Sequence, residues 1–383
     1  MQAIEDFKRI DIKDGQRRWG VFRGIGMRDS LQLLEDLCNA PGVSGFERDI
    51  QDILREELTK LNTEIVTDNL GSIIAKDGDK GPKILVAGHM DEIGFMVRLI
   101  TKEGFIRFSA LGGWWDQVLL SQRVAVYGRK GPVIGVIGSK PPHILSKEER
   151  QKPVEKNDMF IDVGAFSAEE VEELGIRPGD PIVPVSPFTC MGNEDMYIGK
   201  ALDNRVGCAI AVETLKLQKN EGHPNQLYVV GTVQEEVGLR GAQTAGTLVD
   251  PDIALAFEVA IAGDTPGVDE NKAQAKLGKG PVIFILDRSL IPNLKLRDLA
   301  FETAEELDIN YQVDIMEGGS TDAGKLSLVH RGVPSLCIGV PVRYIHSHTG
   351  VVNIQDYYKA IELTSAIVSK LDAETVASIK KVW

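Results

Sequence analysis

The sequence predicts a mixed-sheet α/β/α domain that is interrupted by a small, mostly β domain. Buried-strand patterns alternate with amphipathic helices over residues 27–92 and again over residues 190–383. Between them, over residues 93–189, predicted strands are short and glycine turns are frequent, which is typical of a small β-barrel. Residues 1–26 lack a clear amphipathic pattern, so we predict an N-terminal extension without fixed structure there.

The composition is that of an ordinary globular protein, with 43% hydrophobic and 26% charged residues in 383. The net charge of −13 argues against nucleic acid or anionic membrane as a partner, because both require a basic surface. No apolar run reaches about 18 residues, so no transmembrane helix is expected. The four cysteines lie far apart and form no CxxC, which indicates a reduced, cytoplasmic protein.

The α/β domain is predicted to begin with two helices and two short strands. Leucine spacing predicts a helix over residues 29–39. The segment Ser44-Gly45-Phe46-Glu47 has the pattern of a capping box and predicts a second helix that continues to Leu61. Two short strands are expected over residues 65–75.

A buried strand over residues 84–87 leads into His89 and Asp91. Histidines that bind metals usually have their other ring nitrogen held by a carboxylate or a carbonyl group. Asp91 is therefore a candidate to orient His89. A purely structural histidine is the alternative, because one His-x-Asp pair alone is a weak signal.

The inserted domain is predicted from five short strands and one helix, at residues 105–108, 123–127, 132–137, 159–163 and 181–185 for the strands and 168–174 for the helix. The segment Gly112-Gly113-Trp114-Trp115 is a candidate contact surface, with packed core as the alternative.

After Cys190 the alternating pattern resumes and carries further carboxylates. Asp203 directly precedes an apolar helix over residues 206–217, where it is either a helix N-cap or a ligand. The strand over residues 227–233 is followed by Glu235 and Glu236. Adjacent side chains of an extended chain point to opposite faces, so one glutamate can bind a metal while its neighbour faces a substrate. A solvated strand end is the alternative.

The rest of the chain continues the alternation. Helices are expected over residues 239–249, 293–307 and 355–371, and strands over 252–257, 281–286, 311–315 and 334–338. Glu258 follows the first of these strands, and His346 and His348 follow the last.

Ligands gather at the carboxyl ends of strands in open α/β sheets. Two histidines and three or four carboxylates at this edge fit two divalent metals that share a bridging carboxylate. Nitrogen and oxygen ligands without cysteine suit zinc, cobalt or manganese. Two metals about 3.5–4 Å apart can activate a water for hydrolysis, and a spare carboxylate can carry its proton to a leaving amine.

Five motifs together make residues 27–371 similar to the tetrahedral, dodecameric di-metal aminopeptidases, also called glutamyl or deblocking aminopeptidases or, in older usage, endoglucanases. The motifs are Gly88-His89-Met90-Asp91-Glu92-Ile93-Gly94, Leu202-Asp203-Asn204-Arg205, Gln234-Glu235-Glu236-Val237-Gly238, Gly319-Ser320-Thr321-Asp322-Ala323-Gly324 and Arg343-Tyr344-Ile345-His346-Ser347.

The resemblance implies a role for each candidate residue. The implied metal ligands are Asp203 as the bridge, His89 and Glu258 at one ion, and Glu236 and His346 at the other. Glu235 is implied as the general base and Asp91 as the residue that orients His89. The family usually has aspartate at position 258, so the longer glutamate leaves metal spacing and affinity there open. His348 is an alternative to His346, which matches the motif.

The resemblance further implies that the inserted domain pairs subunits into dimers that build a twelve-subunit shell, and that short peptides are the substrates. A glycoside hydrolase and a non-catalytic binding or scaffold relative are the alternatives, and deacylation or dipeptide hydrolysis at the same metals also stays open. The sequence leaves the preferred N-terminal residue and the metal used in the cell undecided.

Overall fold

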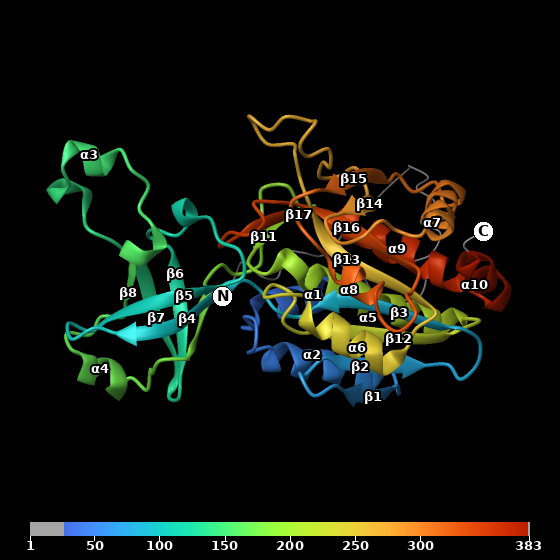
Figure 1. Ribbon diagram of the computed structural model, residues 1–383, viewed down its shortest axis with the longest axis horizontal. Coiled ribbons are helices and arrows are strands. Elements are labelled where there is room, and N and C mark those ends of the chain that lie inside the picture. The colour runs from blue at the N-terminus through green and yellow to red at the C-terminus, as the bar shows by residue number, and fades with distance from the viewer. Residues whose placement is uncertain (1–26, 382–383) are drawn as a thin grey trace, which may run out of the picture.

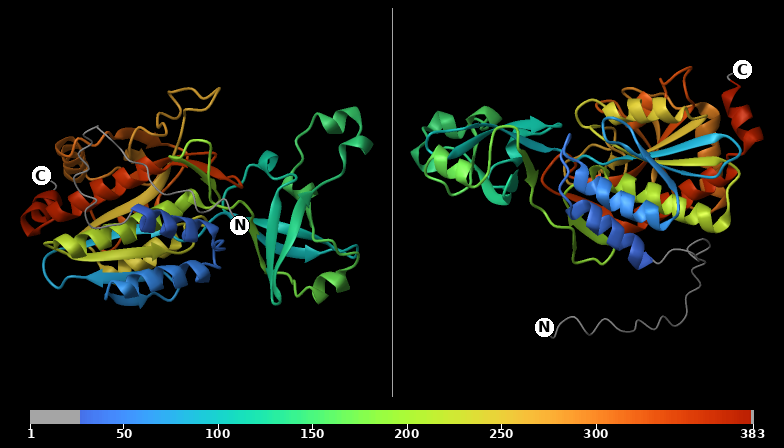
Figure 2. Two further views of the ribbon diagram at one scale, coloured as in Figure 1. Left: turned by 180° about the vertical axis from the view of Figure 1, so that it is seen from behind. Right: turned by 90° about the horizontal axis from the view of Figure 1, so that it is seen from below.

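The computed structural model describes residues 27–381, so the predicted extension over residues 1–26 lies outside the described residues. A larger α/β part lies beside a smaller β-barrel (Figure 1). The views of Figure 2 show the same side-by-side arrangement from behind and from below. The large mixed sheet and the closed barrel confirm the predicted fold class.

The α/β part contains eight α-helices and eleven strands within the described residues. The helices are α1 (Met27–Asn39), α2 (Arg48–Lys60), α5 (Leu202–Glu221), α6 (Arg240–Val249), α7 (Leu294–Glu306), α8 (Asp322–Leu326), α9 (Ile354–Lys370) and α10 (Ala373–Lys380). The strands are β1 (Glu64–Thr67), β2 (Ile73–Asp77), β3 (Lys83–His89), β10 (Thr189–Cys190), β11 (Met196–Gly199), β12 (Gln226–Thr232), β13 (Ile253–Ile261), β14 (Val282–Asp287), β15 (Gln312–Met316), β16 (Ser335–Arg343) and β17 (Gly350–Asn353).

The centre of the sheet is a block of four parallel strands. The sheet order is β1-β2-β12-β3-β13-β16-β17-β11-β10, with β14 paired to both β15 and β16. Within this order β12, β3, β13 and β16 run parallel to one another. Their carboxyl ends therefore lie along one edge, which is where ligand sites form in α/β sheets.

Helices cover both faces of the sheet. Ile84 and Val86 of β3 pack with α1, α2, α5, α7 and α9 in one apolar core. Leu85 and Ala87 of the same strand pack with α6 and α8 in a second core. Because successive side chains of a strand point to opposite faces, one short strand belongs to both cores, and the predicted α/β/α layering follows.

The barrel is closed in the order β4-β5-β8-β7-β6-β9 and has its own apolar core around Phe95 and Ile161. Its strands are β4 (Gly94–Ile100), β5 (Phe105–Leu111), β6 (Arg123–Gly128), β7 (Gly131–Gly138), β8 (Phe160–Asp162) and β9 (Pro181–Pro184). Two short helices, α3 (Lys147–Arg150) and α4 (Ala168–Glu173), lie in its connections.

Some elements differ from the sequence-based expectations. β4, β10, β11, β17, α3, α8 and α10 had no counterpart among the predicted elements. β13 extends to Ile261, so Glu258 lies inside the strand rather than after it. No helix among residues 27–381 has the length and hydrophobicity needed to span a bilayer.

The predicted capping box is wrong. α2 begins at Arg48 without a side-chain cap hydrogen bond. The Ser44 hydroxyl instead donates to Asp91 Oδ2 at 2.6 Å, and Glu47 Oε1 accepts from the backbone N–H of Gln234 at 3.0 Å. Both side chains of the predicted box are therefore used in contacts between distant segments rather than at the helix start.

Candidate metal centre

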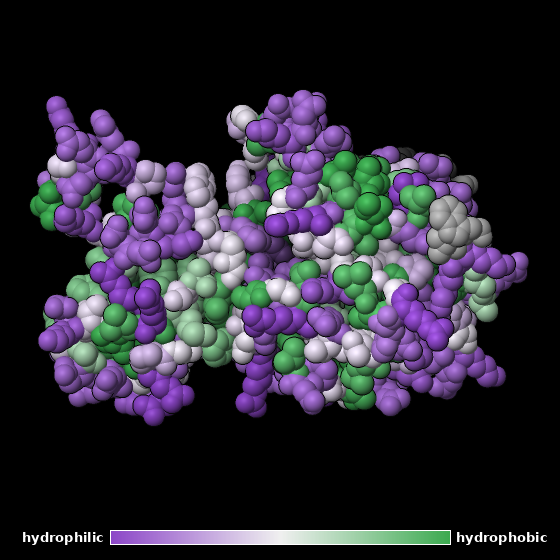
Figure 3. All heavy atoms as spheres, viewed as in Figure 1, coloured by the Kyte–Doolittle hydropathy of each residue, from purple (hydrophilic) through white to green (hydrophobic). Residues whose placement is uncertain are grey.

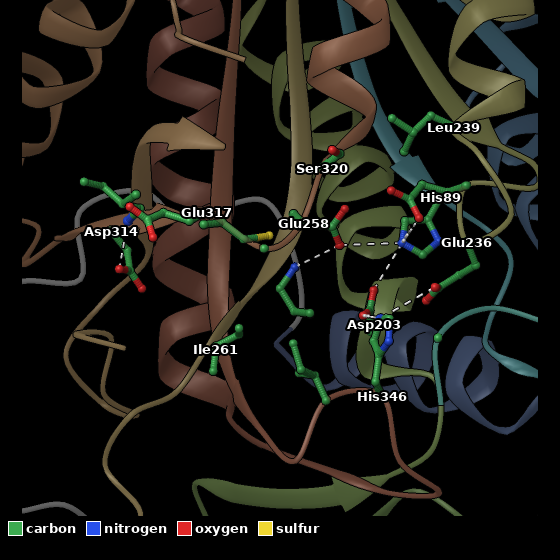
Figure 4. Close-up of a pocket in the computed structure, with 18 of the residues that line it drawn as sticks. His89, Asp203, Glu236, Leu239, Glu258, Ile261, Asp314, Glu317, Ser320 and His346 are labelled. Atoms are coloured by element: carbon green, nitrogen blue, oxygen red, sulfur yellow. Dashed lines mark hydrogen bonds and ion pairs between the residues drawn. The ribbon is translucent and has the colours of Figure 1, made fainter. Parts of the chain in front are cut away.

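The carboxyl edge of the parallel strands brings the candidate ligands together. His89 ends β3, Glu258 lies near the end of β13, and Glu235 with Glu236 follow β12. Asp203 comes from the start of α5, and His346 from the loop after β16. Figure 4 shows five of these six side chains pointing toward one another, with Glu235 not labelled.

Asp203 lies between the two histidines. Its Oδ1 is 3.1 Å from Nε2 of His89, and its Oδ2 is 3.5 Å from Nε2 of His346. Asp203 and Asn204 have non-helical backbone angles, and Asp203 is not the cap of α5. Its side chain therefore faces the cluster with one oxygen toward each histidine, as a bridging carboxylate requires.

Each histidine has a further carboxylate beside it. Glu258 Oε1 lies 3.5 Å from His89 Nε2, and Glu236 Oε2 lies 3.5 Å from His346 Nε2. Glu235 Oε2 is slightly farther from His89 Nε2, at 3.9 Å. The nitrogen and oxygen atoms of His89, Glu235 and Glu258 lie within 4.8 Å of one another, as do those of His89, Asp203 and Glu236.

His89 is fixed by its other ring nitrogen. Nδ1 lies 3.0 Å from the backbone carbonyl oxygen of Asp91 and 3.4 Å from its Oδ1. A carbonyl oxygen only accepts, so Nδ1 carries a proton, and Nε2 faces the carboxylates, where it becomes a metal ligand once its own proton is lost. This is the orientation that a metal-binding imidazole needs.

The carboxylate of Asp91 has a second set of partners. Oδ1 accepts the backbone N–H of Glu235 at 2.9 Å, and Oδ2 accepts that of Glu236 at 3.1 Å. Asp91 is fully buried, and although burial raises its pKa, the bonds from His89 and Ser44 hold the pKa below its usual value. Asp91 thus links His89 to both glutamates.

The electrostatics of the cluster favour a bound cation. Burial raises the pKa of Glu235 and Glu236 well above the usual range, and it raises that of Glu258 to about 8 although His89 opposes the shift. Burial also acts to raise the pKa of Asp203, but the bond and charge of His89 outweigh it and the pKa is lowered. Burial lowers the pKa of His89, but Glu258 and Glu235 raise it well above its usual value.

These groups fit a divalent metal by their chemistry. Within residues 27–381, the recorded ion pairs of Asp203, Glu235, Glu236 and Glu258 involve histidines and neither lysine nor arginine. Protons therefore neutralise part of the negative charge of these buried carboxylates, and a divalent cation could replace the protons. Imidazole nitrogen with carboxylate oxygen is a donor set of zinc, cobalt and manganese proteins.

His348 lies outside this cluster. It is 3% exposed, and its ring packs against that of Trp114 at a centroid distance of 5.2 Å. Neither ring nitrogen has a hydrogen-bond partner among the described residues, and burial lowers its pKa to about 4. His346 and not His348 therefore faces the carboxylates.

The cluster opens into a cleft of about 1170 Å³. Apolar side chains, among them Leu239, Ile261 and Ile345, line it together with Asp314 and Glu317. Figure 4 shows Asp314 and Glu317 at the end of the cleft away from His89. The candidate ligands thus lie at one end of a cavity whose volume is at or above the range of small-molecule sites.

Sequence reasoning missed three contributors to the site. Gly113 borders the cleft from the barrel, and a Cβ there would lie 2.9 Å from His346 Nδ1. The Ser44 hydroxyl donates to Asp91, and Glu47 accepts from the backbone N–H of Gln234, so both residues help to hold the backbone that carries the glutamates. The Gly-Gly pair and the Ser-x-x-Glu pattern were visible in the sequence, but the first was interpreted as part of a contact surface or packed core and the second as a capping box.

Comparisons with known proteins found related sequences and similar structures. The sequence pattern of the family described as M42 glutamyl aminopeptidase matches residues 71–363. A glutamyl aminopeptidase of Lactococcus lactis is 37% identical over 90% of this chain and 97% of its own length. A TET aminopeptidase from a marine sediment Thaumarchaeota archaeon is 48% identical, with a TM-score of 0.90 over 92% of this chain and 99% of that one. The TET1 peptidase of Pyrococcus horikoshii, which can assemble into a tetrahedron or a large octahedral shell, is 32% identical, with a TM-score of 0.81 over 90% of this chain and 100% of that one.

Proposed function

The chain belongs to the M42 glutamyl aminopeptidase family, and from that premise we propose a metal-dependent aminopeptidase that removes N-terminal residues from short peptides at two divalent ions. The observation that carries the two-ion proposal is Asp203, whose two oxygens face His89 and His346 separately. Family membership argues against the glycoside hydrolase, which would also leave the histidines without a role.

In this proposal Asp203 would be the ligand shared by the two ions. His89 and Glu258 would hold one of them, and Glu236 and His346 would hold the other. Glu258 is one methylene longer than the aspartate usual in the family, yet its Oε1 lies 3.5 Å from His89 Nε2, within reach of a shared ion. Zinc or cobalt suits this donor set, and manganese is a further candidate.

When bound, the two ions lower the pKa of a water between them and stabilise negative charge on the peptide carbonyl oxygen. Glu235 then acts as general base: its carboxylate accepts the proton of the attacking water and passes it to the departing amine nitrogen. Asp91 holds His89 and the backbone of Glu235 in place.

The assembly proposed is a dodecamer built from dimers through the barrel. Similarity to the TET1 peptidase supports it. The barrel and its loops also expose large hydrophobic side chains, among them Leu99, Ile134, Ile144 and Phe166, and Figure 3 shows hydrophobic atoms over the barrel strands. We place the enzyme in the cytoplasm, which the four free cysteines support.

The test is hydrolysis of aminoacyl chromogenic substrates, short peptides and N-acylated peptides, after chelation and after return of zinc, cobalt or manganese. Metal-restored release of single N-terminal residues is the expected result, and the panel also gives the side-chain preference. Cleavage of acylated peptides alone would indicate a deacylase. No cleavage by the folded, metal-loaded protein would favour the non-catalytic binding relative.

A further inference from the structure

Glu47 is a buried carboxylate, and one of its two hydrogen-bond partners lies in the segment that carries the proposed base. It is 4% exposed, and its Oε1 accepts the backbone N–H groups of Gly45 at 2.8 Å and Gln234 at 3.0 Å. It directly precedes α2, but its side chain makes no cap hydrogen bond to that helix. The Glu47 side chain therefore does not cap α2.

Gln234 is the residue at which the chain turns from β12 toward Glu235. Its φ is 57°, in the left-handed region that is uncommon for residues other than glycine. A residue holds such a conformation only where its surroundings determine it. The hydrogen bond to Glu47 is one contact that does so.

Three consecutive backbone N–H groups are held by two carboxylates. Glu47 accepts from Gln234, and Asp91 accepts from Glu235 with Oδ1 and from Glu236 with Oδ2. The Ser44 hydroxyl donates to Asp91 Oδ2 at 2.6 Å and the neighbouring Gly45 N–H donates to Glu47 Oε1 at 2.8 Å, so one short segment contacts both carboxylates. This support fixes the backbone that carries both glutamates, from which Glu235 points as the proposed base and Glu236 as a proposed metal ligand.

We propose that Glu47 is a positioning residue of the peptidase site, because its hydrogen bond to Gln234 sets the backbone from which Glu235 and Glu236 reach the metals and the substrate. The role of Glu235 in this statement rests on the proposed function. This role requires a side chain at position 47 that is long enough to reach Gln234 and has an oxygen to accept its N–H. It does not require a negative charge. A contribution of Glu47 to folding alone would instead change stability and leave the active site unaltered.

Two variants separate reach from charge. Glu47→Gln keeps the length and an oxygen that can accept both hydrogen bonds, so its kcat should stay close to that of the parent enzyme. Glu47→Asp keeps the charge but is one methylene too short for Gln234. Its kcat should fall by about 10- to 100-fold with little change in KM, as expected when a catalytic group is displaced by about an ångström.

Two further measurements do not depend on activity. Calorimetric titration of the metal-free variants with zinc should show weaker binding of one ion to Glu47→Asp, because Glu236 is displaced, and normal binding to Glu47→Gln. Hydrogen exchange of the peptide that contains residues 234–236 should be faster in Glu47→Asp only. If the parent binds zinc but cleaves no peptide, the proposed function fails, whereas these two measurements still judge Glu47.

Asp252→Ala is the matched control. The Asp252 carboxylate also accepts a distant backbone N–H, that of Lys83 at 3.0 Å, but at the opposite end of β3 from His89. Loss of this bond should lower Tm while kcat and zinc binding persist. The proposal is overturned if Glu47→Asp behaves like this control, or if Glu47→Gln and Glu47→Asp lose kcat and zinc affinity equally.

Discussion

Asp203 and His89 are joined by a 3.1 Å contact between Oδ1 and Nε2. The other oxygen of Asp203 faces Nε2 of His346 at 3.5 Å. One carboxylate thus spans two histidines that lie 257 residues apart in the chain, from 89 to 346. Replacing either oxygen of Asp203 should therefore affect one ion of the proposed pair more than the other.

Asp203→Asn tests this bridge. The asparagine amide keeps one ligand oxygen, while its NH₂ group has no lone pair to offer a metal. Bound zinc should fall from two ions to at most one per subunit, and kcat/KM should fall by at least about 100-fold, since two-metal charge stabilisation contributes several kcal/mol. Metal analysis of the dialysed protein and kinetics on one aminoacyl substrate measure the two effects.

The control for this substitution is Asp162→Asn in the barrel, where Oδ1 accepts only the nearby backbone N–H of Gly164 among its recorded bonds. It should keep both ions and full activity. Two tightly bound zinc ions in Asp203→Asn would contradict the bridging role.

Glu235→Gln separates the base from the ligands. The amide cannot accept and release the proton of the attacking water, so kcat should fall by about 10²- to 10⁴-fold, the usual contribution of a general base. Zinc content should be nearly unchanged, because Glu235 is not one of the proposed ligands. Stopped assays of kcat and metal analysis on the same preparation provide the comparison.

Glu317→Gln is the matched control, since Glu317 is an exposed carboxylate that lines the same cleft. Its kcat should stay close to that of the parent. Substantial activity in Glu235→Gln would show that another group moves the proton.

The candidate cluster was predictable because each of its residues stands out within a short stretch of sequence. Apolar strands that end in histidine or glutamate are visible in the sequence, and parallel strands put such ends along one edge. The order β12-β3-β13-β16 in the structure places the segments of His89, Glu236, Glu258 and His346 next to one another. Pattern and chemistry thus identified which residues meet, although not at what distances.

The supports of the cluster were not predictable from local patterns. Ser44 and Glu47 fit a capping box, but the structure pairs them with Asp91 and with Gln234, which is 187 residues away from Glu47. Likewise, nothing near Gly113 in sequence indicates that His346 lies against it. Such contacts depend on the tertiary arrangement, and a tertiary partner can override a local propensity.

The stability of the metal-free protein should depend on pH with a definite sign. Glu235, Glu236 and Glu258 have pKa values raised by burial, the last to about 8 from 4.5, and the pKa of His89 is also raised. The folded state therefore binds more protons than the unfolded state between about pH 5 and pH 8, so stability falls as pH rises through this range. Calorimetric scans of the chelated protein at several pH values would show a falling Tm.

Zinc should change this dependence. Metal ligands must be deprotonated, so affinity rises with pH, and the increase in Tm caused by zinc should be larger near pH 8 than near pH 6. Variant Asp203→Asn, with fewer ions, should show a smaller increase. A Tm of the chelated protein that rose from about pH 5 to pH 8 would contradict the pKa assignment of the cluster.

Gly113→Ala should disturb the metal site from the barrel side. A Cβ at this position would lie 2.9 Å from Nδ1 and 3.3 Å from Cε1 of His346. The His346 side chain is 42% exposed, so its ring can move away, but this would take Nε2 from Asp203 and Glu236. We expect weaker zinc binding at the ion held by His346 and a kcat reduced by about 10-fold or more.

Gly192→Ala is the control, because its Cβ meets no atom within 4 Å. Equal zinc titrations and equal kcat for the two variants would show that the barrel loop does not hold His346 in place.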